Sequence, residues 1–294
     1  MRVLITGARG MLGSKVCEVL NDDSFCAFET DISGCDIYMD ITDPESIASA
    51  IRCYKPTSII HCAAMTDVAG CTSNPDLAFK INTIGTRNLA IASEKANIHL
   101  INLSTVYVFD GKEPSYTEFS PTCPINIYGL SKLMAEEAIK ESTHKFTNIR
   151  TNWLFAPTHS NFVKTIFNKL KEDKPIEVVT DQFGSPTNIK DLALFIKSIL
   201  GTTRYGTYHF SNSGSCSRYL FAKKVQELSG YMKQPVLPTT EAKLDRFCST
   251  LRPRNSVLQN YRLELEGYPS PRPWEDALSE CITELKELDA RSRL

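Results

Sequence analysis

Two residues that could do chemistry, Tyr128 and Lys132, stand four positions apart. An α-helix has about 3.6 residues per turn, so both side chains would project from one helical face. A tyrosine with a pKa near ~10 exchanges protons poorly at neutral pH unless a nearby ammonium favours its anion. The spacing therefore predicts that Tyr128 protonates the alkoxide formed when a nicotinamide delivers hydride. Lys132 would hold the ribose hydroxyls and lower the pKa of the tyrosine.

Upstream of this pair, the segment His99–Ser104 leads into Thr105. A threonine hydroxyl there can donate a hydrogen bond to a substrate carbonyl and polarise it for attack. A tyrosine and a lysine at this spacing occur often by chance. Their position downstream of a glycine-rich turn and of Thr105 is what makes these three residues the candidate catalytic group.

The glycine-rich turn is Thr6-Gly7-Ala8-Arg9-Gly10-Met11-Leu12-Gly13, between the first apolar segment and the first helical pattern. Gly7 permits a tight turn, Gly10 lets backbone N–H groups approach a pyrophosphate, and Gly13 allows close packing of helix on strand. The helix N-terminus would present free N–H groups and the positive end of its dipole to the phosphates. The turn therefore predicts a dinucleotide site, although such turns also serve packing alone.

Two residues give conflicting indications of the coenzyme. Asp31 directly follows the second predicted strand, where a carboxylate can accept from a ribose 2′-OH and would repel a 2′-phosphate, which favours NADH. Arg9 can pair with a 2′-phosphate, which favours NADPH, or it can be a solvated surface charge. We expect either NADPH or NADH as cofactor, with a slight preference for NADPH.

The elements that position these residues are indicated by short apolar segments that alternate with longer helical patterns along the chain. Such alternation predicts an α/β fold with a doubly wound parallel sheet of Rossmann type. The predicted strands are Arg2–Thr6, Phe25–Thr30, Ser58–Cys62, His99–Ser104 and Asn148–Trp153. The predicted helices between them are Gly10–Leu20, Pro44–Tyr54, Pro75–Ala96 and Tyr128–Ser142.

The second half of the chain predicts a smaller α/β lobe. Its helical patterns and short strands are Asn161–Glu172, Ile176–Thr180, Ile189–Leu200, Thr207–Phe210, Ser217–Ser229 and Pro273–Leu288. We expect residues 1–155 to form the cofactor domain, with segments from about 181–211 returning to it. Residues 156–294 would form mainly the substrate lobe.

Composition excludes several classes of function. The 294 residues include 33 Lys and Arg against 34 Asp and Glu, which offers no basic surface for nucleic acid or an anionic membrane. No apolar segment reaches the length of about 20 residues needed to cross a bilayer, and no signal peptide is evident. We expect a cytoplasmic protein whose 10 cysteines are free, buried thiols. The five histidines are scattered along the chain and form no cluster of metal ligands, so we expect no metal site.

Taken in order along the chain, these motifs resemble the dTDP-4-dehydrorhamnose reductase family of extended short-chain dehydrogenase/reductases. The matching segments extend over nearly the whole chain: Leu4-Ile5-Thr6-Gly7, Asp40-Ile41-Thr42-Asp43, His61-Cys62-Ala63-Ala64-Met65-Thr66, Ala78-Phe79-Lys80-Ile81-Asn82, Leu103 to Gly111, Tyr128 to Lys132, Asn161 to Thr165, Asp181 to Thr187, Gly206-Thr207-Tyr208-His209 and Arg252 to Leu258.

The resemblance implies roles for further residues. Met11 and Leu12 would lie over the pyrophosphate, and Asp40 and Ile41 would flank the adenine. The cofactor would be lined by Ala63, Ala64 and Thr66, with Thr105, Tyr128 and Lys132 as the catalytic triad. The indole of Trp153 would form an apolar wall for the sugar, unless it is only a core aromatic. An arginine such as Arg252 would suit the diphosphate of a nucleotide-sugar, although a packing or surface role is the alternative.

The implied reaction is reduction of the 4-keto group of a nucleotide-linked 6-deoxy sugar, first of all dTDP-4-dehydro-L-rhamnose. Val106 stands where the family has an aspartate that contacts the sugar, so we expect Val106 to border the substrate. The loss of the acidic group leaves another nucleotide-sugar reductase or epimerase open. Lys15 replaces an acidic residue that binds magnesium in some members, so we expect no metal. A regulatory protein similar to the β subunit of methionine adenosyltransferase is a third alternative. The assembly is left open, with a homodimer as one alternative.

Overall fold

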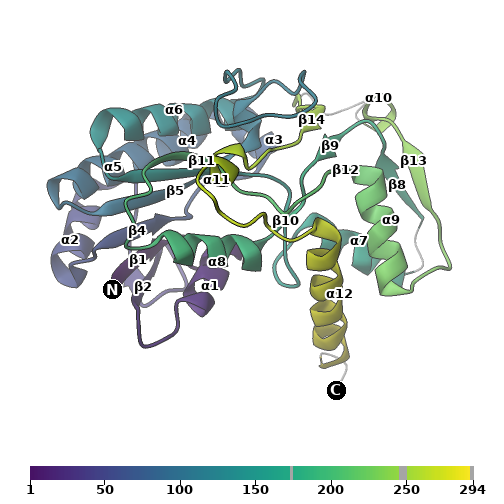
Figure 1. The fold of residues 1–294 in the computed structure, drawn as a ribbon, viewed down its shortest axis with the longest axis horizontal. Helices are drawn as coiled ribbons and strands as arrows, with labels where there is room; N and C mark the ends of the chain where they lie inside the picture. Colours follow the sequence, from purple (N-terminus) through teal and green to yellow (C-terminus); the bar gives the residue numbers. More distant parts are fainter. Residues whose placement is uncertain (173–174, 245–249, 292–294) are drawn as a thin grey trace.

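The computed structural model describes residues 1–172, 175–244 and 250–291. Seven parallel strands form the main sheet in the order β11-β6-β5-β4-β1-β2-β3 (Figure 1). Their bounds are β1 Arg2–Thr6, β2 Cys26–Asp31, β3 Ile37–Tyr38, β4 Ser58–His61, β5 His99–Thr105, β6 Phe146–Thr151 and β11 Gly206–His209. The order reverses at β1, as in a doubly wound sheet, so the predicted Rossmann-type fold is confirmed.

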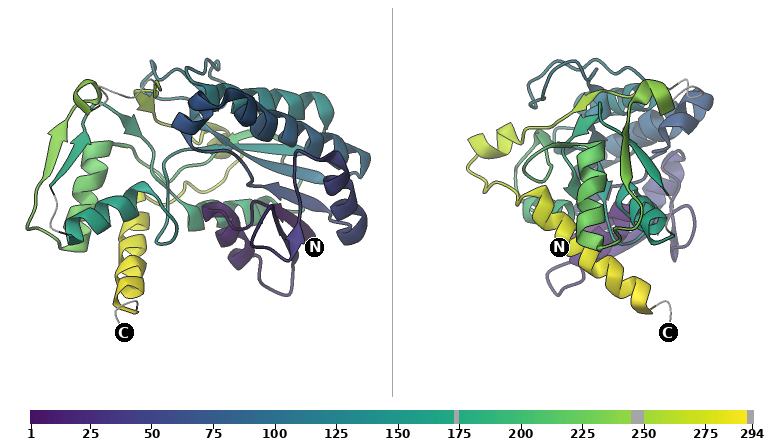
Figure 2. Two further views of the ribbon diagram at one scale, coloured as in Figure 1. Left: turned by 180° about the vertical axis from the view of Figure 1, so that it is seen from behind. Right: turned by 90° about the vertical axis from the view of Figure 1, so that its right-hand side faces the viewer.

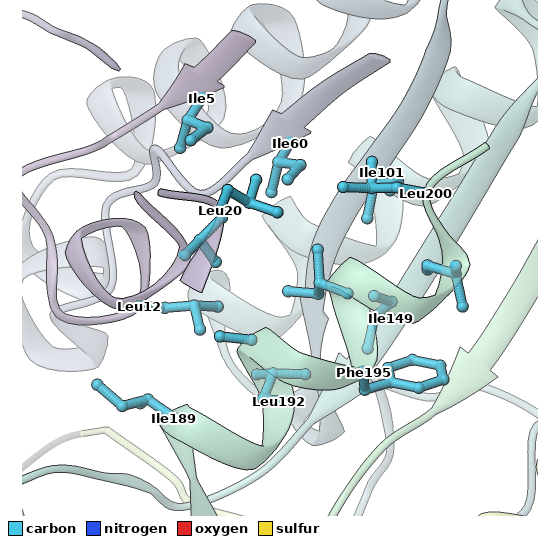
Figure 3. Packing of buried hydrophobic residues seen from close by; sticks show 14 of the residues in the cluster. Ile5, Leu12, Leu20, Ile60, Ile101, Ile149, Ile189, Leu192, Phe195 and Leu200 are labelled. Carbon is cyan, nitrogen blue, oxygen red and sulfur yellow. The ribbon is translucent and has the colours of Figure 1, made fainter. Parts of the chain in front are cut away.

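Successive residues of a strand point to opposite faces of the sheet, and helices cover both faces. Val3 and Ile5 face a cluster with α1 (Met11–Val19) and α8 (Ile189–Ile199), whose side chains meet those of the strands in Figure 3. Leu4 faces the opposite cluster, which includes α2 (Pro44–Tyr54), α5 (Thr86–Lys95) and α6 (Ile127–Ser142). Both faces of β1 are therefore buried, which explains why its three central residues, Val3 to Ile5, are all apolar.

Two predicted elements differ from the structure in an informative way. The expected helix Pro75–Ala96 is divided into α4 (Pro75–Ala78), a π-helical segment η1 (Phe79–Gly85) and α5. Such π turns are typical of functional sites. The expected strand Asn148–Trp153 ends at Thr151, because Trp153 adopts a φ of +40° and cannot continue a strand.

A second group of elements lies at one end of the sheet (Figure 2). It contains α7 (Phe162–Lys171), α9 (Arg218–Ser229) and α12 (Trp274–Arg291) around the parallel pair β8 (Ile176–Val179) and β13 (Val236–Thr239), with its own hydrophobic core. The expected returning segments correspond to α8 and β11, which pack in the layers of the main sheet. The domain boundary near residue 155 stays a prediction.

Short elements complete the fold. They are α3 Val68–Ser73, η2 Val106–Val108, β7 Leu154–Phe155, β9 Phe183–Gly184, β10 Thr187–Asn188, β12 Cys216–Ser217, α10 Glu241–Leu244, β14 Asn255–Ser256 and α11 Tyr261–Leu265. No helix in the described ranges is long and apolar enough to span a membrane. The nine described cysteines are free, but Cys26, Cys53 and Cys123 are exposed, so the expectation that all are buried was wrong. The tenth, Cys248, lies outside the described residues.

Candidate active site

Helix α6 carries the predicted tyrosine and lysine into one cavity. The helix begins after Asn126, whose side chain accepts a hydrogen bond of 2.8 Å from the N–H of Gly129. A Cβ on Gly129 would lie 2.1 Å from the carbonyl oxygen of Tyr107, so glycine is what lets the helix pack directly on η2. This packing sets the ring of Tyr107 edge-on to the ring of Tyr128, with 5.6 Å between centroids.

Thr105 ends β5, where the strand meets η2, and its Oγ1 accepts from the N–H of Tyr107 at 3.2 Å. It lines the same cavity as Tyr128 and Lys132, so the three predicted catalytic residues are brought together. The cavity measures about 390 Å³. The other lining residues are Gly10, Met11, Leu12, Gly13, Cys62, Ala64, Thr66, Val68, Leu103, Ser104, Tyr107, Thr151, Asn152, Trp153, Leu154 and Arg218.

Burial sets the ionisation of the two α6 residues. It raises the pKa of Tyr128 to about 12, and the hydroxyl of Thr105 opposes that rise. Burial lowers the pKa of Lys132 to about 8, and the charge of Glu136 opposes that fall. The expected lowering of the Tyr128 pKa by Lys132 stays a prediction, and in this structure loss of water around the phenolate is the largest influence on that pKa.

A network of buried polar side chains holds the catalytic helix α6 in place. Glu136, one turn after Lys132, accepts from Arg150 Nε at 2.9 Å and from Arg150 Nη2 at 2.7 Å, and its Oε1 also accepts from Ser104. Asn82, in the π-helical segment, donates to Ser131 Oγ at 3.0 Å and to the carbonyl of Met65 at 3.0 Å. The network ties β5, β6 and the chain after β4 to α6, which restricts where Lys132 can lie.

The glycine turn is shaped by close backbone contacts. Gly7 has a φ of +65°, and a Cβ there would lie 2.6 Å from the backbone nitrogen of Ala63. A Cβ on Gly13 would lie 2.1 Å from the carbonyl oxygen of Gly7, so α1 packs directly on the turn. No side chain caps the N-terminus of α1 at Gly10. Its first N–H groups therefore face the cavity free to bind an anion, and the turn fits a dinucleotide pyrophosphate.

The predicted coenzyme determinants lie beside this turn. Asp31 accepts from the backbone N–H of Arg9 at 3.1 Å and from that of Ile32 at 2.8 Å. The side chain of Arg9 is exposed; its Nε donates to the carbonyl of Gly34, and its Nη1 lies 3.9 Å from Glu29 Oε2. The carboxylate of Asp31 thus positions the turn, while the guanidinium of Arg9 stays at the surface.

A second group of residues around the cavity comes from outside the turn. Trp153 lines it, and the guanidinium carbon of Arg218 lies 3.7 Å from the centre of the Trp153 ring. Arg252 lines an adjoining cavity of about 470 Å³, which Arg218 also borders. Sequence reasoning missed Arg218, since no local pattern links it to Trp153, which lies 65 positions earlier. Tyr107 and Asn152 were also missed, although both stand next to residues that were predicted.

Some predicted residues lie elsewhere. Val106 does not line the cavity: its side chain is fully buried in a cluster with Val108, Phe109, Tyr116 and Leu258. The expectation that it contacts substrate was wrong, because the η2 turn directs residue 106 into the core. Asp40, Ile41 and Ala63 also lie outside the lining residues, with Ile41 and Ala63 packed in the cluster around α2. Within the described residues, no group of three or more potential metal ligands occurs.

Known proteins share this arrangement over nearly the whole chain. Residues 1–287 match the family model of the RmlD substrate binding domain. The chain is 37% identical to the spore coat polysaccharide biosynthesis protein SpsK of Bacillus subtilis, over 96% of this chain and 97% of that protein. It is 35% identical to the dTDP-4-dehydrorhamnose reductase of Streptomyces griseus, over 97% and 94% of the two chains.

Solved structures give the same result. The crystal structure of dTDP-4-dehydrorhamnose reductase from Bacillus anthracis in complex with NADP superposes with a TM-score of 0.91 at 40% identity, covering 96% of this chain and 99% of that one. UDP-glucose 4-epimerase from Thermus thermophilus, at 20% identity and a TM-score of 0.84, shares the fold over 97% and 99%. The chain therefore belongs to the dTDP-4-dehydrorhamnose reductase family of oxidoreductases.

Proposed function

We propose that this protein reduces the 4-keto group of a nucleotide-linked 6-deoxy sugar with NADPH or NADH. The first candidate reaction is dTDP-4-dehydro-L-rhamnose to dTDP-L-rhamnose, a precursor for surface polysaccharide. One observation carries the proposal: Thr105, Tyr128 and Lys132 line a single cavity that continues to the uncapped N-terminus of α1. The names of the relatives, several of which are 4-ketosugar reductases, agree with this reaction.

The nicotinamide dinucleotide would supply the hydride, and the chain offers the groups to hold it. The N–H groups that follow Gly10 would bind the pyrophosphate, with Gly7 and Gly13 allowing the close approach. Ala64 and Thr66 line the next part of the cavity. The Nζ of Lys132 forms no hydrogen bond or ion pair with any described residue, which leaves it free for ribose hydroxyls.

Tyr128 would donate the proton. With a pKa of about 12 it is a phenol at neutral pH, which is the form that a reduction requires. Its proton would pass to the substrate oxygen as that oxygen gains negative charge, and Thr105 would donate a hydrogen bond to the same oxygen. Lys132, with a pKa of about 8, is mostly an ammonium at pH 7 and would stabilise the phenolate that remains.

The sugar would lie against the indole of Trp153, which lines the same cavity as the glycine turn. The backbone of Trp153 is held at a φ of +40°, an unfavourable conformation for a bulky side chain. Such strain is found where the position of a side chain matters to a binding site. We therefore assign Trp153 to the sugar and Arg252 to the nucleotide side.

The test is oxidation of NADPH and of NADH against a panel of nucleotide-linked 4-ketosugars, followed by the loss of absorbance of the reduced coenzyme. We expect turnover by the native protein and a fall in kcat of about 10²- to 10⁴-fold in Tyr128→Phe. Tyr261→Phe is the matched control, because Tyr261 is exposed and does not line the cavity. Full activity in Tyr128→Phe would contradict the mechanism.

The same panel tests the alternatives. Val106 places an apolar, buried side chain where the resemblance implies an acidic contact with the sugar, and this favours a substrate other than the rhamnose precursor. Turnover of another 4-ketosugar would support that second candidate. Absence of turnover with every sugar would reject both enzymes and favour a regulatory protein.

A further inference from the structure

Arg218, the first residue of α9, stands where two cavities meet. It lines the catalytic cavity together with Trp153 and Tyr107, and it lines the adjoining cavity together with Arg252 and Lys169. An elongated ligand whose sugar lies near Tyr128 would have to pass Arg218 to reach the second cavity. Arg218 therefore lies where the group that links the two ends of such a ligand would be.

Aromatic rings hold the guanidinium of Arg218. Its central carbon lies 3.7 Å from the centre of the Trp153 ring and 4.8 Å from that of Phe162. Rings at these distances attract a cation through their π faces. Stacking uses the face of the guanidinium and leaves the N–H donors around its edge free for a bidentate acceptor.

No carboxylate of the described residues pairs with this arginine. The side chain of Arg218 forms no hydrogen bond or ion pair with any residue of the described ranges, and Arg252 likewise has none. The two positive charges are close enough to affect each other: burial lowers the pKa of Arg218 to about 10, and the charge of Arg252 contributes in the same direction. Two like charges therefore border one cavity, and no carboxylate of the described residues forms an ion pair with either arginine.

The adjoining cavity also contains two carboxylates, Glu177 and Glu241. Glu241 Oε1 accepts from Gln182 Nε2 at 2.9 Å, and neither carboxylate is paired with Arg218 or Arg252. With Lys169, three cations therefore border a space with two acids. An anion bound between Arg218 and Arg252 would relieve the repulsion between them and occupy their free donors.

We infer that Arg218 and Arg252 together bind the diphosphate of the substrate, and that Arg218 makes the protein select diphosphate-linked sugars over unlinked or uncharged ones. This inference rests on the proposed function, because it assigns a subsite to that substrate. It places the sugar in the cavity with Tyr128 and the nucleoside in the cavity bordered by Phe162 and Lys169.

Calorimetric titration of the NADP-bound protein tests the inference without turnover. The probes are thymidine 5′-diphosphate and thymidine, with UDP and uridine as the second pair. In Arg218→Met we expect the Kd of the preferred diphosphate to rise about 10- to 100-fold and that of its nucleoside to stay the same. Arg218→Lys, which keeps the charge but loses the planar fork, should fall between the two.

Two controls separate binding from folding. Arg87→Met removes an exposed arginine that borders neither cavity, and its Kd values should equal those of the native protein. The Kd of NADPH, measured on each variant, should stay within about twofold, as expected when the α1 site is untouched. An equal loss of diphosphate and nucleoside binding in Arg218→Met would show that Arg218 only supports Trp153, and would overturn the inference.

Other outcomes distinguish this inference from the proposed function. Unchanged diphosphate affinity in Arg218→Met, with 4-ketosugar turnover intact, rejects the inference and keeps the proposed function. Arginine-dependent diphosphate binding without turnover of any 4-ketosugar rejects the proposed reaction and keeps the diphosphate site. Failure of the native protein to bind either diphosphate rejects the inference.

Discussion

The indole of Trp153 fills the space that any side chain at residue 184 would need. A Cβ built on Gly184 would lie 2.5 Å from Trp153 Cε2 and 2.7 Å from Asn152 Nδ2. The two residues belong to different segments, with Gly184 in the short strand β9, which pairs with β12 and β14. A glycine that takes no part in the chemistry thus determines where the aromatic wall of the cavity stands.

We therefore expect Gly184→Ala to displace the indole. The KM for the ketosugar should rise about 10-fold or more, since a shift of about 1 Å in a positioning residue can have such an effect. The KM for NADPH should not change, because the atoms that a Cβ on residue 184 would meet do not belong to the glycine turn. Gly267→Ala is the control: it strains a positive φ of +75° with nothing within 4 Å, so it should lower Tm but not alter KM. Equal KM values for Gly184→Ala and native protein would reject this role.

Lys132 is expected to reduce stability while it supports activity. Its Nζ is buried and forms no ion pair with a described residue, and burial lowers its pKa from 10.5 to about 8. That difference corresponds to about 3 kcal/mol of unfolding free energy lost at pH 7. The unfolded chain binds the proton more tightly between pH 8 and 10.5, so the penalty disappears as pH rises through this range.

Lys132→Met should therefore lose reductase activity and gain up to about 3 kcal/mol of unfolding free energy at pH 7, measured by guanidinium denaturation. The gain should vanish near pH 10.5. Lys140→Met, on the exposed side of the same helix, should change neither quantity. Lower stability in Lys132→Met at pH 7 would contradict the assignment of a buried, unpaired charge.

Three buried histidines predict sensitivity to acid. Burial lowers the pKa of His61 and of His209 to about 3, and that of His99 to about 4. Below the ordinary pKa of 6.5 each of these histidines is protonated in the unfolded chain but stays neutral in the folded chain. The unfolding free energy therefore falls as the pH is lowered. Each histidine contributes about 1.4 kcal/mol per pH unit between 6.5 and its folded value.

The unfolding free energy should accordingly fall by about 4 kcal/mol per pH unit between pH 6 and 4.5. Denaturant titrations across this range measure the slope. His99→Gln should make it shallower by about 1.4 kcal/mol per pH unit, whereas replacing the exposed His144 should leave it unchanged. A flat profile down to pH 4.5 would falsify the prediction.

Arg9 is expected to set the preference between the two coenzymes. Its guanidinium is exposed beside the turn, whereas both oxygens of Asp31 already accept from backbone N–H groups. Arg9→Gln should raise the KM for NADPH about 10-fold through loss of a charged contact with the 2′-phosphate, and leave that for NADH within twofold. Arg52→Gln, an exposed substitution on α2, provides the comparison. An equal effect on both coenzymes would indicate that Arg9 only shapes the turn.

Local sequence was sufficient for the elements and for the catalytic group. The apolar strands and the helices between them follow from periodicities of a few residues. Helix Pro44–Tyr54 and strand Arg2–Thr6 have the predicted bounds. The bounds of most other predicted elements differ by one or two positions, whereas the expected helix Pro75–Ala96 is divided and α12 ends three positions later than predicted. Helical geometry alone predicts that Tyr128 and Lys132 lie on one face of a helix. The spacing of the glycines predicts that they precede the N-terminus of a helix.

Only the tertiary structure decided which distant residues share the cavity and what pKa values their side chains have. Arg218 meets Trp153 because α9 and the segment after β6 pack together, and no local pattern encodes a contact over 65 positions. The pKa of Tyr128 rises because neighbouring elements exclude water, which depends on packing. The burial of the Val106 side chain in the core likewise depends on packing between elements. Spacing along the chain thus determined which groups could react, and long-range packing determined their surroundings.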